Sequence, residues 1–174
     1  MSVALYAVVV VLVALERLVE LAISRSNLAW ARRRGGFETG RGHFPVMVAL
    51  HTGLLVACLV EVVVADRPFL PVLGWSMLVL LLLTEATRGW VIATLGRQWN
   101  TRVVVVPGMR RVTRGPYRWT SHPNYVVVAV EGVALPLVHT AWVTAVVFTV
   151  LNAALLLLVR IPAEERALSR LRSA

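Results

Sequence analysis

Apolar residues along this chain occur in runs long enough to cross a lipid bilayer, separated by polar stretches. A membrane helix needs about 20 mainly apolar residues. Five segments fit this pattern, at about 3–23, 45–65, 69–87, 124–139 and 140–160. No long polar linker separates the last two, so we expect them to form a tight helical hairpin. The pattern predicts an all-α integral membrane protein with about five transmembrane helices.

One long polar connection, at about 88–123, lies between the third and fourth predicted spans. Within it, Val103 to Val106 is expected to be a short extended piece, and Gly115-Pro116 is typical of a turn. After Pro162 the pattern predicts a short amphipathic helix that lies in the membrane interface.

Composition supports the bilayer as the solvent of this chain. Of its 174 residues 58% are hydrophobic, and the mean hydropathy is +0.74, whereas a soluble domain is about 45–50% apolar. The formal net charge is +9, carried by arginine without lysine. Because the arginines lie between apolar runs and no nucleic-acid-binding motif is present, we expect them to face anionic lipid rather than nucleic acid. Cys58 stands alone, which excludes a disulfide framework, and no metal site is expected.

Arginine placement predicts the orientation of the spans. The stretches 24–44 and 88–123, together with the C-terminal end from Arg160, hold 16 of the 18 arginines. The opposite loops hold only Arg67, and Arg17 lies within a span. Cytoplasmic loops carry an excess of basic residues. The N-terminus is therefore expected outside, and the terminal helix in the cytoplasm.

Ionisable residues inside membrane spans are costly and are functional candidates. Here they are Glu16, Arg17, Glu20, His51, Glu61, Glu85 and Glu131, with Arg88 at a span end. Several have ordinary explanations. Arg17 and Glu20, like Glu85 and Arg88, are three residues apart and suit a pair within one helix. For His51 the ordinary explanation is a hydrogen bond between helices.

Glu131 is the sharpest catalytic candidate. It lies near the middle of its span, two helical turns after Asn124 and on the same face, so the two form a polar stripe. A buried carboxylate there suits a general base, and His51 on another span is the alternative.

Two polar clusters are expected at the same end of the predicted hairpin. Gly115-Pro116-Tyr117 leads to Ser121-His122-Pro123-Asn124-Tyr125, and Arg160-Ile161-Pro162-Ala163-Glu164-Glu165 follows the hairpin. Each has an ordinary explanation: Pro162 and the glutamates suit a helix start, and Arg160 suits snorkelling. Their combination favours a binding site.

This combination resembles the signature of the isoprenylcysteine carboxyl methyltransferase family of membrane enzymes. In that family a Gly-x-Tyr turn leads to Arg-His-Pro-x-Tyr, and Arg-Ile-x-x-Glu-Glu comes one hairpin later. The resemblance covers about 110–170, with Ser121 where the family usually has arginine, a contact that would pass to a neighbour such as Arg118.

The first half resembles one bacterial branch of the family. The residues that carry this likeness are Glu16-Arg17, Glu20, Arg25, Asn27, Trp30, Gly42-His43-Phe44-Pro45 and His51. That branch includes membrane O-methyltransferases that accompany type III polyketide synthases and methylate alkylpyrones or alkylresorcinols.

The resemblance implies S-adenosylmethionine as methyl donor. The residues expected to bind it are Tyr117, His122, Asn124, Tyr125, Arg160, Glu164 and Glu165. Either glutamate would bind the amino group, Arg160 the carboxylate, and Tyr125 the sulfonium. The absence of a glycine-rich dinucleotide fingerprint after a predicted strand argues against a soluble Rossmann methyltransferase.

We therefore expect a single membrane domain, 1–174, with substrate-side helices in 1–95 and the cofactor-binding part in 96–174. The expected reaction is O-methylation of an alkylpyrone or alkylresorcinol hydroxyl. The expected location is the bacterial cytoplasmic membrane, with the active site facing the cytoplasm and a functional link to a type III polyketide synthase. Carboxyl methylation of an isoprenylated cysteine is an alternative. A small transporter or lipid-binding membrane protein is another, because intramembrane glutamates suit a proton or cation path.

Overall fold

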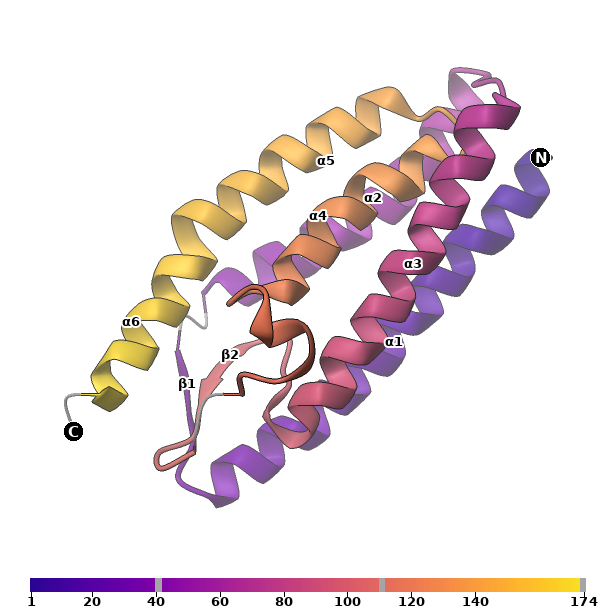
Figure 1. The fold of residues 1–174 in the computed structure, drawn as a ribbon. Coiled ribbons are helices and arrows are strands. Elements are labelled where there is room, and N and C mark those ends of the chain that lie inside the picture. Colours follow the sequence, from indigo (N-terminus) through magenta and orange to yellow (C-terminus); the bar gives the residue numbers. More distant parts are fainter. Residues whose placement is uncertain (40–41, 110–111, 173–174) are drawn as a thin grey trace.

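A computed structural model describes residues 1–39, 42–109 and 112–172 and shows an elongated helical bundle (Figure 1). The main helices are α1 (Val3–Arg33), α2 (His43–Val64), α3 (Pro71–Leu95), α4 (Pro123–Leu137), α5 (Trp142–Leu155) and α6 (Ile161–Arg172). The short elements are β1 (Phe37–Thr39), η1 (Gly96–Gln98), β2 (Val103–Val105), η2 (Gly115–Arg118) and η3 (Leu156–Arg160). The predicted predominance of helix is confirmed.

Within the described residues, three helical segments are long and apolar enough to cross a membrane by length and composition: Phe44–Val64, Pro71–Gln98 and Trp142–Arg166. Pro123–Leu137 is a shorter apolar helix. Helix α1 is long but carries three ionisable residues close together in its apolar stretch. The chain is thus a helical membrane protein, while the count of five spans and the orientation of the termini stay predictions.

The core lies where α1, α2, α3, α4 and α5 meet. Tyr6 is fully buried there and donates a hydrogen bond to the carbonyl oxygen of Leu135 at 3.1 Å. Gly132 allows α4 to approach α5, because a Cβ at this position would lie 2.2 Å from the Phe148 ring. Large apolar side chains such as Leu158, 75% exposed, point outward, as expected where lipid surrounds a helix.

Two helices continue beyond the predicted spans. Helix α1 runs on to Arg33 and α3 to Leu95. The extension of α1 is held by polar packing: Ser24 Oγ donates to Asn100 Oδ1 at 2.7 Å, and Asn27 Nδ2 donates to the Trp99 carbonyl at 2.7 Å. The first part of the stretch 24–44, predicted as a loop, is therefore helical, because the long polar connection packs against it.

The boundary predicted at Pro162 is not a break. Helix α5 passes through a single π-helical segment, Leu156–Arg160, directly into α6. A wider π turn can relieve the clash that a proline makes with the preceding turn. The terminal amphipathic helix is therefore present as α6 but is continuous with α5, and its position in the membrane interface stays a prediction.

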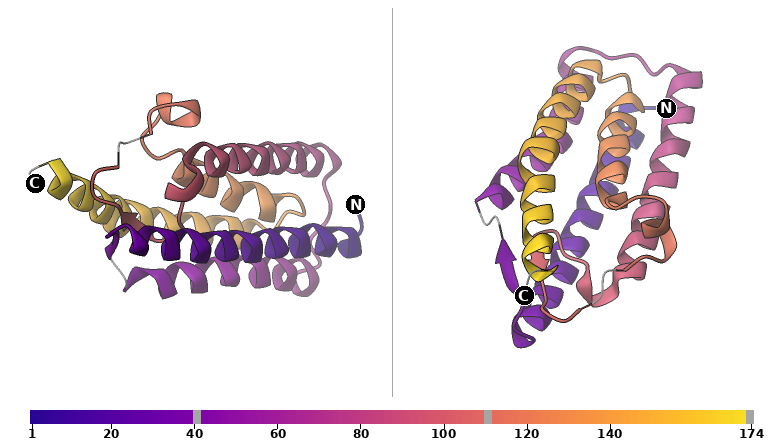
Figure 2. Two further views of the ribbon diagram at one scale, coloured as in Figure 1. Left: turned by 90° about the horizontal axis from the view of Figure 1, so that it is seen from below. Right: turned by 60° about the vertical axis from the view of Figure 1, so that its left-hand side comes forward.

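The long polar connection, the β1–β2 pair and α6 gather at the end of the bundle opposite the N-terminus (Figure 2). The predicted extended piece is confirmed as β2, which pairs antiparallel with β1 so that Phe37 opposes Val105. The predicted turn at Gly115 is a 3-10 turn, in which Gly115 has a positive φ of 57°. This arrangement closes one end of the bundle with polar backbone and loops.

Candidate functional site

A polar cavity lies at that closed end, between β2, the η2 turn, the start of α4 and the α5–α6 junction. Its empty space of about 660 Å³ includes open solvent at its mouth. Six of the seven residues predicted to bind the cofactor line it: Tyr117, His122, Asn124, Tyr125, Arg160 and Glu164. The seventh, Glu165, is exposed on α6 and does not line it.

The two sequence motifs meet in this polar cavity. The Tyr125 hydroxyl donates to Glu164 Oε2 at 2.6 Å. The His122 ring stacks on the Tyr125 ring with centroids 5.4 Å apart, and His122 Nδ1 lies 3.6 Å from Glu164 Oε1. Pro123 is the first residue of α4, and its fixed φ suits a helix start. His122 therefore lies just before the helix and Tyr125 in its first turn.

Arg160 anchors the wall between the hairpin and the long connection. It is buried, donates from Nη2 to the Thr101 carbonyl at 2.8 Å, and also contacts Sδ of Met47. Its guanidinium lies 5.5 Å from the Tyr125 ring centroid. Its Nε is buried and has no hydrogen-bond partner among the described residues. One N–H group of Arg160 is therefore left for a ligand.

Tyr117 lies beside Glu164 in the polar cavity. Burial, and after it the charge of Glu164, raises the pKa of the Tyr117 phenol. The hydroxyl therefore stays protonated near neutral pH and can donate a hydrogen bond.

A mainly apolar cavity, the apolar cavity, adjoins the polar one, and its empty space of about 840 Å³ includes open solvent. Its apolar wall comes from α1, α2, α4, α5 and η3, and consists of Leu21, Met47, Val48, Leu55, Val128, Leu155 and Leu156. The two cavities share Trp99, Asn124, Tyr125 and Arg160. Asn124 Oδ1 is buried and has no hydrogen-bond partner in the described parts of the chain. This junction is where molecules bound in the two cavities would meet.

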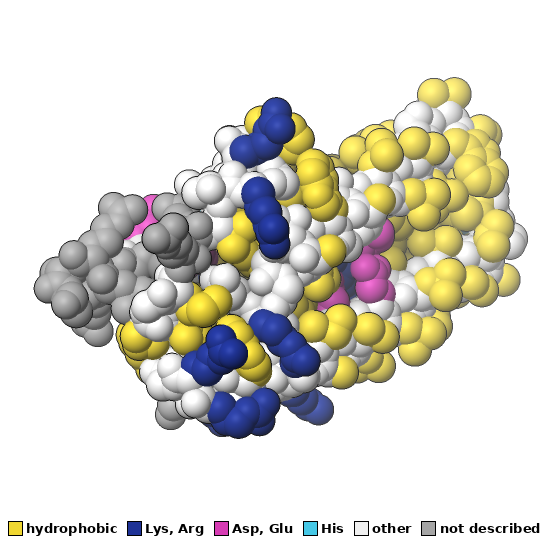
Figure 3. All heavy atoms as spheres, turned by 60° about the horizontal axis from the view of Figure 1, so that its bottom comes forward, with side chains coloured by type: hydrophobic (Ala, Val, Ile, Leu, Met, Phe, Trp, Pro, Cys, Tyr) yellow, Lys and Arg dark blue, Asp and Glu magenta, His cyan; other side chains and the backbone are white. Residues whose placement is uncertain are grey.

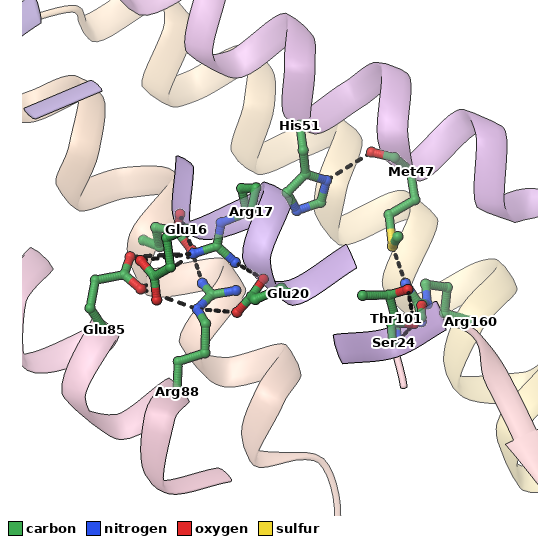
Figure 4. A network of polar contacts seen from close by, with 11 residues as sticks. Glu16, Arg17, Glu20, Ser24, Met47, His51, Glu85, Arg88, Thr101 and Arg160 are labelled. Carbon is green, nitrogen blue, oxygen red and sulfur yellow. Dashed lines mark hydrogen bonds and ion pairs between the residues drawn. The ribbon is translucent and has the colours of Figure 1, made fainter. Parts of the chain in front are cut away.

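An ion cluster lies at another edge of the apolar cavity (Figure 4). It consists of Glu16, Arg17 and Glu20 from α1, Glu85 and Arg88 from α3, and Glu131 from α4. Four carboxylates thus face two guanidinium groups within a bundle of apolar helices.

Arg17 is the centre of the cluster. It donates from Nη1 to Glu20 Oε2 at 2.6 Å, while its Nη2 lies 3.3 Å from Glu85 Oε2 and 3.2 Å from Glu131 Oε1. Arg88 contacts Glu131 directly and lies 3.3 Å from Glu85. The two predicted pairs within one helix are present, but they belong to a network across three helices. The sequence pattern missed this network because its partners are far apart along the chain.

The two predicted catalytic residues lie in different places. Glu131 is buried between Arg17 and Arg88 and is not part of the wall described for either cavity. His51 lines the apolar cavity. Its Nδ1 lies 2.8 Å from the Met47 carbonyl of its own helix, so this ring nitrogen bonds within α2 rather than between helices. The general-base role of either residue stays a prediction.

A helical membrane protein with a polar cavity that adjoins an apolar one is suited to binding a polar and a lipophilic molecule next to each other. Comparison with known proteins agrees with this class. The profile of the isoprenylcysteine carboxyl methyltransferase (ICMT) family matches residues 77–170, which include most of the polar cavity. The chain belongs to this family, and membership indicates a membrane methyltransferase.

A relative from Bacillus subtilis (strain 168), named "Uncharacterized protein YpbQ", is 36% identical over 154 residues. The match covers 88% of this chain and 90% of that protein. No solved structure matches the chain. The ion cluster residues of α1, and His51 of α2, lie outside the segment that the family profile matches.

Proposed function

We propose that the protein transfers a methyl group from S-adenosylmethionine to a hydroxyl group of a lipophilic small molecule, an alkylpyrone or an alkylresorcinol. One observation carries the proposal. The polar cavity, lined by the two family motifs, shares four wall residues with a mainly apolar cavity.

The charges of the polar cavity fit the methyl donor, which when bound supplies an electrophilic methyl group on a sulfonium. Glu164 can bind the α-amino group, and the unpaired Nε of Arg160 can bind the carboxylate by a charge-assisted hydrogen bond. The Tyr125 ring, which already has the Arg160 guanidinium 5.5 Å away, offers its π electrons to a cation. Tyr117 and Asn124 add neutral polar groups for the adenosine.

The apolar cavity fits the acceptor. Its aliphatic wall suits an alkyl tail, and the acceptor head would lie at the shared residues, next to the methyl donor. Methyl transfer needs the acceptor oxygen in line with the sulfur–methyl bond in a site that excludes water. Two adjoining cavities with a common wall support this proposal, because the two molecules would lie side by side.

The proposed site faces the cytoplasm, and the membrane is the bacterial cytoplasmic membrane. This assignment rests on the 16 of 18 arginines in segments that are predicted to be cytoplasmic, which include the connection that forms the polar cavity. A type III polyketide synthase is the proposed functional partner, because such an enzyme makes alkylpyrones and alkylresorcinols.

Carboxyl methylation of an isoprenylated cysteine is the second candidate reaction. Arg17 and Arg88 both line the apolar cavity, and guanidinium groups bind carboxylates. The family description names this activity. The hydroxyl acceptor remains the leading proposal because of the likeness of the first half to the polyketide-associated branch.

The test uses the purified full chain in lipid nanodiscs. Calorimetric titration with S-adenosylhomocysteine is expected to show binding. Incubation with labelled S-adenosylmethionine and a panel of an alkylpyrone, an alkylresorcinol and an S-farnesylcysteine derivative is expected to label the first two. Labelling of the farnesylcysteine alone would replace the proposed acceptor by the second candidate. Absence of binding would favour a transporter or lipid-binding protein.

A further inference from the structure

Glu20 of α1 has one carboxylate oxygen held and the other without a donor. The residue is 6% exposed. Arg17 Nη1 donates to Oε2 at 2.6 Å, which fixes the carboxylate. Oε1 is buried and accepts no hydrogen bond from the described residues, and Arg88 Nε lies 3.6 Å from it. A buried oxygen left in this state is costly, so it is a candidate to receive a hydrogen bond from a ligand.

The apolar cavity is the space from which such a donor can come, because Glu20 is part of its wall. The same wall holds Asn152, which is 2% exposed and whose Oδ1 also has no hydrogen-bond partner in the described chain. Two buried oxygen acceptors without hydrogen-bond donors therefore belong to residues of one cavity wall, which is mainly apolar. A ligand with a hydroxyl group and an alkyl body matches this combination.

The other candidates for a base are placed less favourably. Glu131, which contacts Arg17 and Arg88 as Glu20 does, lies outside the wall described for the cavity. A proton on His51 would add a positive charge to a cavity already lined by three arginines. A proton on Glu20 instead reduces the excess of carboxylates over guanidinium groups in the ion cluster.

We propose that Glu20 is the general base that receives the proton of the acceptor hydroxyl. This inference rests on the proposed function, and it requires the acceptor hydroxyl to lie between the shared residues and Glu20, within hydrogen-bond reach of Glu20 Oε1. The acceptor oxygen forms a bond to the methyl carbon, the methyl–sulfur bond breaks with its electron pair left on sulfur, and the hydroxyl proton moves to Glu20 Oε1. The sulfonium charge disappears and the carboxylate becomes neutral, so charge and atoms balance.

The ion cluster that would hold the transferred proton also reaches the surface of the bundle. Arg17 contacts Glu20, Glu85 and Glu16, and the Glu16 side chain is 35% exposed. The space-filling view shows acidic side chains in a hollow of the surface between hydrophobic side chains (Figure 3). The cluster therefore extends from the cavity wall to a hollow in the surface of the bundle at Glu16.

The first arm of the test measures binding and needs no methyl donor. A 5-alkylresorcinol and its dimethyl ether are titrated against the wild type, Glu20→Gln and Glu131→Gln in nanodiscs. Glu131→Gln is the matched control, because it removes a carboxylate from the same two arginines without altering the described cavity wall. A hydrogen bond to a charged group favours the resorcinol by about tenfold or more. We expect Glu20→Gln to lose this preference and Glu131→Gln to keep it.

The second arm measures turnover with acceptors of different acidity. A general base contributes about 10²–10⁴-fold, and an acidic pyrone enol needs it less than a phenol with a pKa of about 10. Glu20→Gln should lower turnover of the alkylresorcinol by about a hundredfold or more and that of the alkylpyrone far less. Glu131→Gln should affect both acceptors equally.

Binding of S-adenosylhomocysteine reports whether each variant folds. If Glu20→Gln does not bind it, Glu20→Asp replaces it, because Asp keeps the charge beside Arg17 but withdraws the oxygen from the cavity. A selective loss on the alkylresorcinol with Glu20→Asp supports the proposal, and unchanged turnover overturns it. Selective loss in Glu131→Gln alone would also overturn it.

If the wild type methylates both acceptors and Glu20→Gln loses activity equally on both, only the role of Glu20 fails. If the wild type methylates neither acceptor, the proposed function fails as well.

Discussion

At the scale of single residues, adjacent glutamates on one helix have different surroundings. Glu164 accepts a hydrogen bond from Tyr125 and lines the polar cavity, whereas Glu165 is exposed. The motif leaves open which of them binds the amino group of the methyl donor. The contacts favour Glu164, because a carboxylate in a partly closed cavity gains more from a bound cation than one in water.

Glu164→Ala is therefore expected to weaken binding of S-adenosylhomocysteine. Losing a charge-assisted contact costs about 1.5–3 kcal/mol, or about ten- to a hundredfold in affinity. The matched control is Glu165→Ala, which removes a neighbouring carboxylate of the same charge and should leave affinity within about twofold, since an exposed charge is worth little. Calorimetric titration measures both. Equal losses in the two variants would contradict the assignment.

At the scale of elements, α2 caps the start of α5. Glu61 Oε2 accepts from the backbone nitrogen of Thr144 and from its hydroxyl, each at 2.7 Å, and Oε1 accepts from the Val143 nitrogen at 3.1 Å. Arg67 pairs with the same carboxylate at 2.9 Å. A carboxylate at a helix N-terminus satisfies free N–H groups and opposes the helix dipole.

Glu61→Ala should lower the free energy of unfolding in detergent by about 1–2 kcal/mol, while affinity for S-adenosylhomocysteine stays close to that of the wild type. The reason is that the cap lies at the opposite end of the bundle from the polar cavity. Thermal unfolding followed by circular dichroism tests the first part and calorimetry the second. Strongly reduced cofactor affinity in a folded variant would show that this cap also shapes the site.

The contact between α4 and α5 gives a second prediction at this scale. A methyl group on Gly132 would collide with the Phe148 ring, 2.2 Å away. Overpacking of a core costs about 1–3 kcal/mol, so Gly132→Ala should unfold at a lower temperature. The double variant Gly132→Ala with Phe148→Leu should recover part of this loss, because the smaller side chain makes room. Additive destabilisation in the double variant would mean that the two residues do not share the contact.

Elements with a strong local signal could be predicted from the sequence. Val103 to Val105 is extended, Gly115 begins a turn, and α4 and α5 form the expected hairpin. The six residues that line the polar cavity could also be predicted as one group, because both family motifs were expected at the same end of neighbouring helices. Glu164 and Glu165 could not be separated, since both suit the first turn of a helix equally well.

Features that depend on long-range packing could not be predicted. The ion cluster joins Arg17 to Glu85 and Glu131 across three helices, and spacing along the chain reports only partners on the same helix. The course of α5 into α6 was missed because Pro162 is an ordinary start signal, and a π turn leaves no local signature.

At the scale of the whole molecule, the ends of the bundle differ. The polar connection, the β1–β2 pair and α6 occupy one end, and the N-terminus and the α2–α3 connection lie at the other (Figure 1). A chain whose arginines gather at one end should insert with that end in the cytoplasm. The proposed site lies at this end, where a water-soluble methyl donor can reach it.

The last prediction tests this orientation with single cysteines at exposed positions. Cys58 is first replaced by alanine, and a cysteine then replaces Arg33, Arg118 or Asp66 in separate variants, all of them exposed residues. Because 16 of 18 arginines lie on the predicted cytoplasmic side, a membrane-impermeant maleimide should label positions 33 and 118 in inside-out vesicles and position 66 only in right-side-out vesicles. Denatured samples control for equal reactivity of the introduced cysteines.

Labelling of positions 66 and 118 from the same side would overturn the predicted topology between α2 and α4. Labelling of position 33 from the side of position 66 would overturn the placement of α1. Either result would also remove the argument that the polar cavity opens to the cytoplasm, because that argument rests on the same arginine bias.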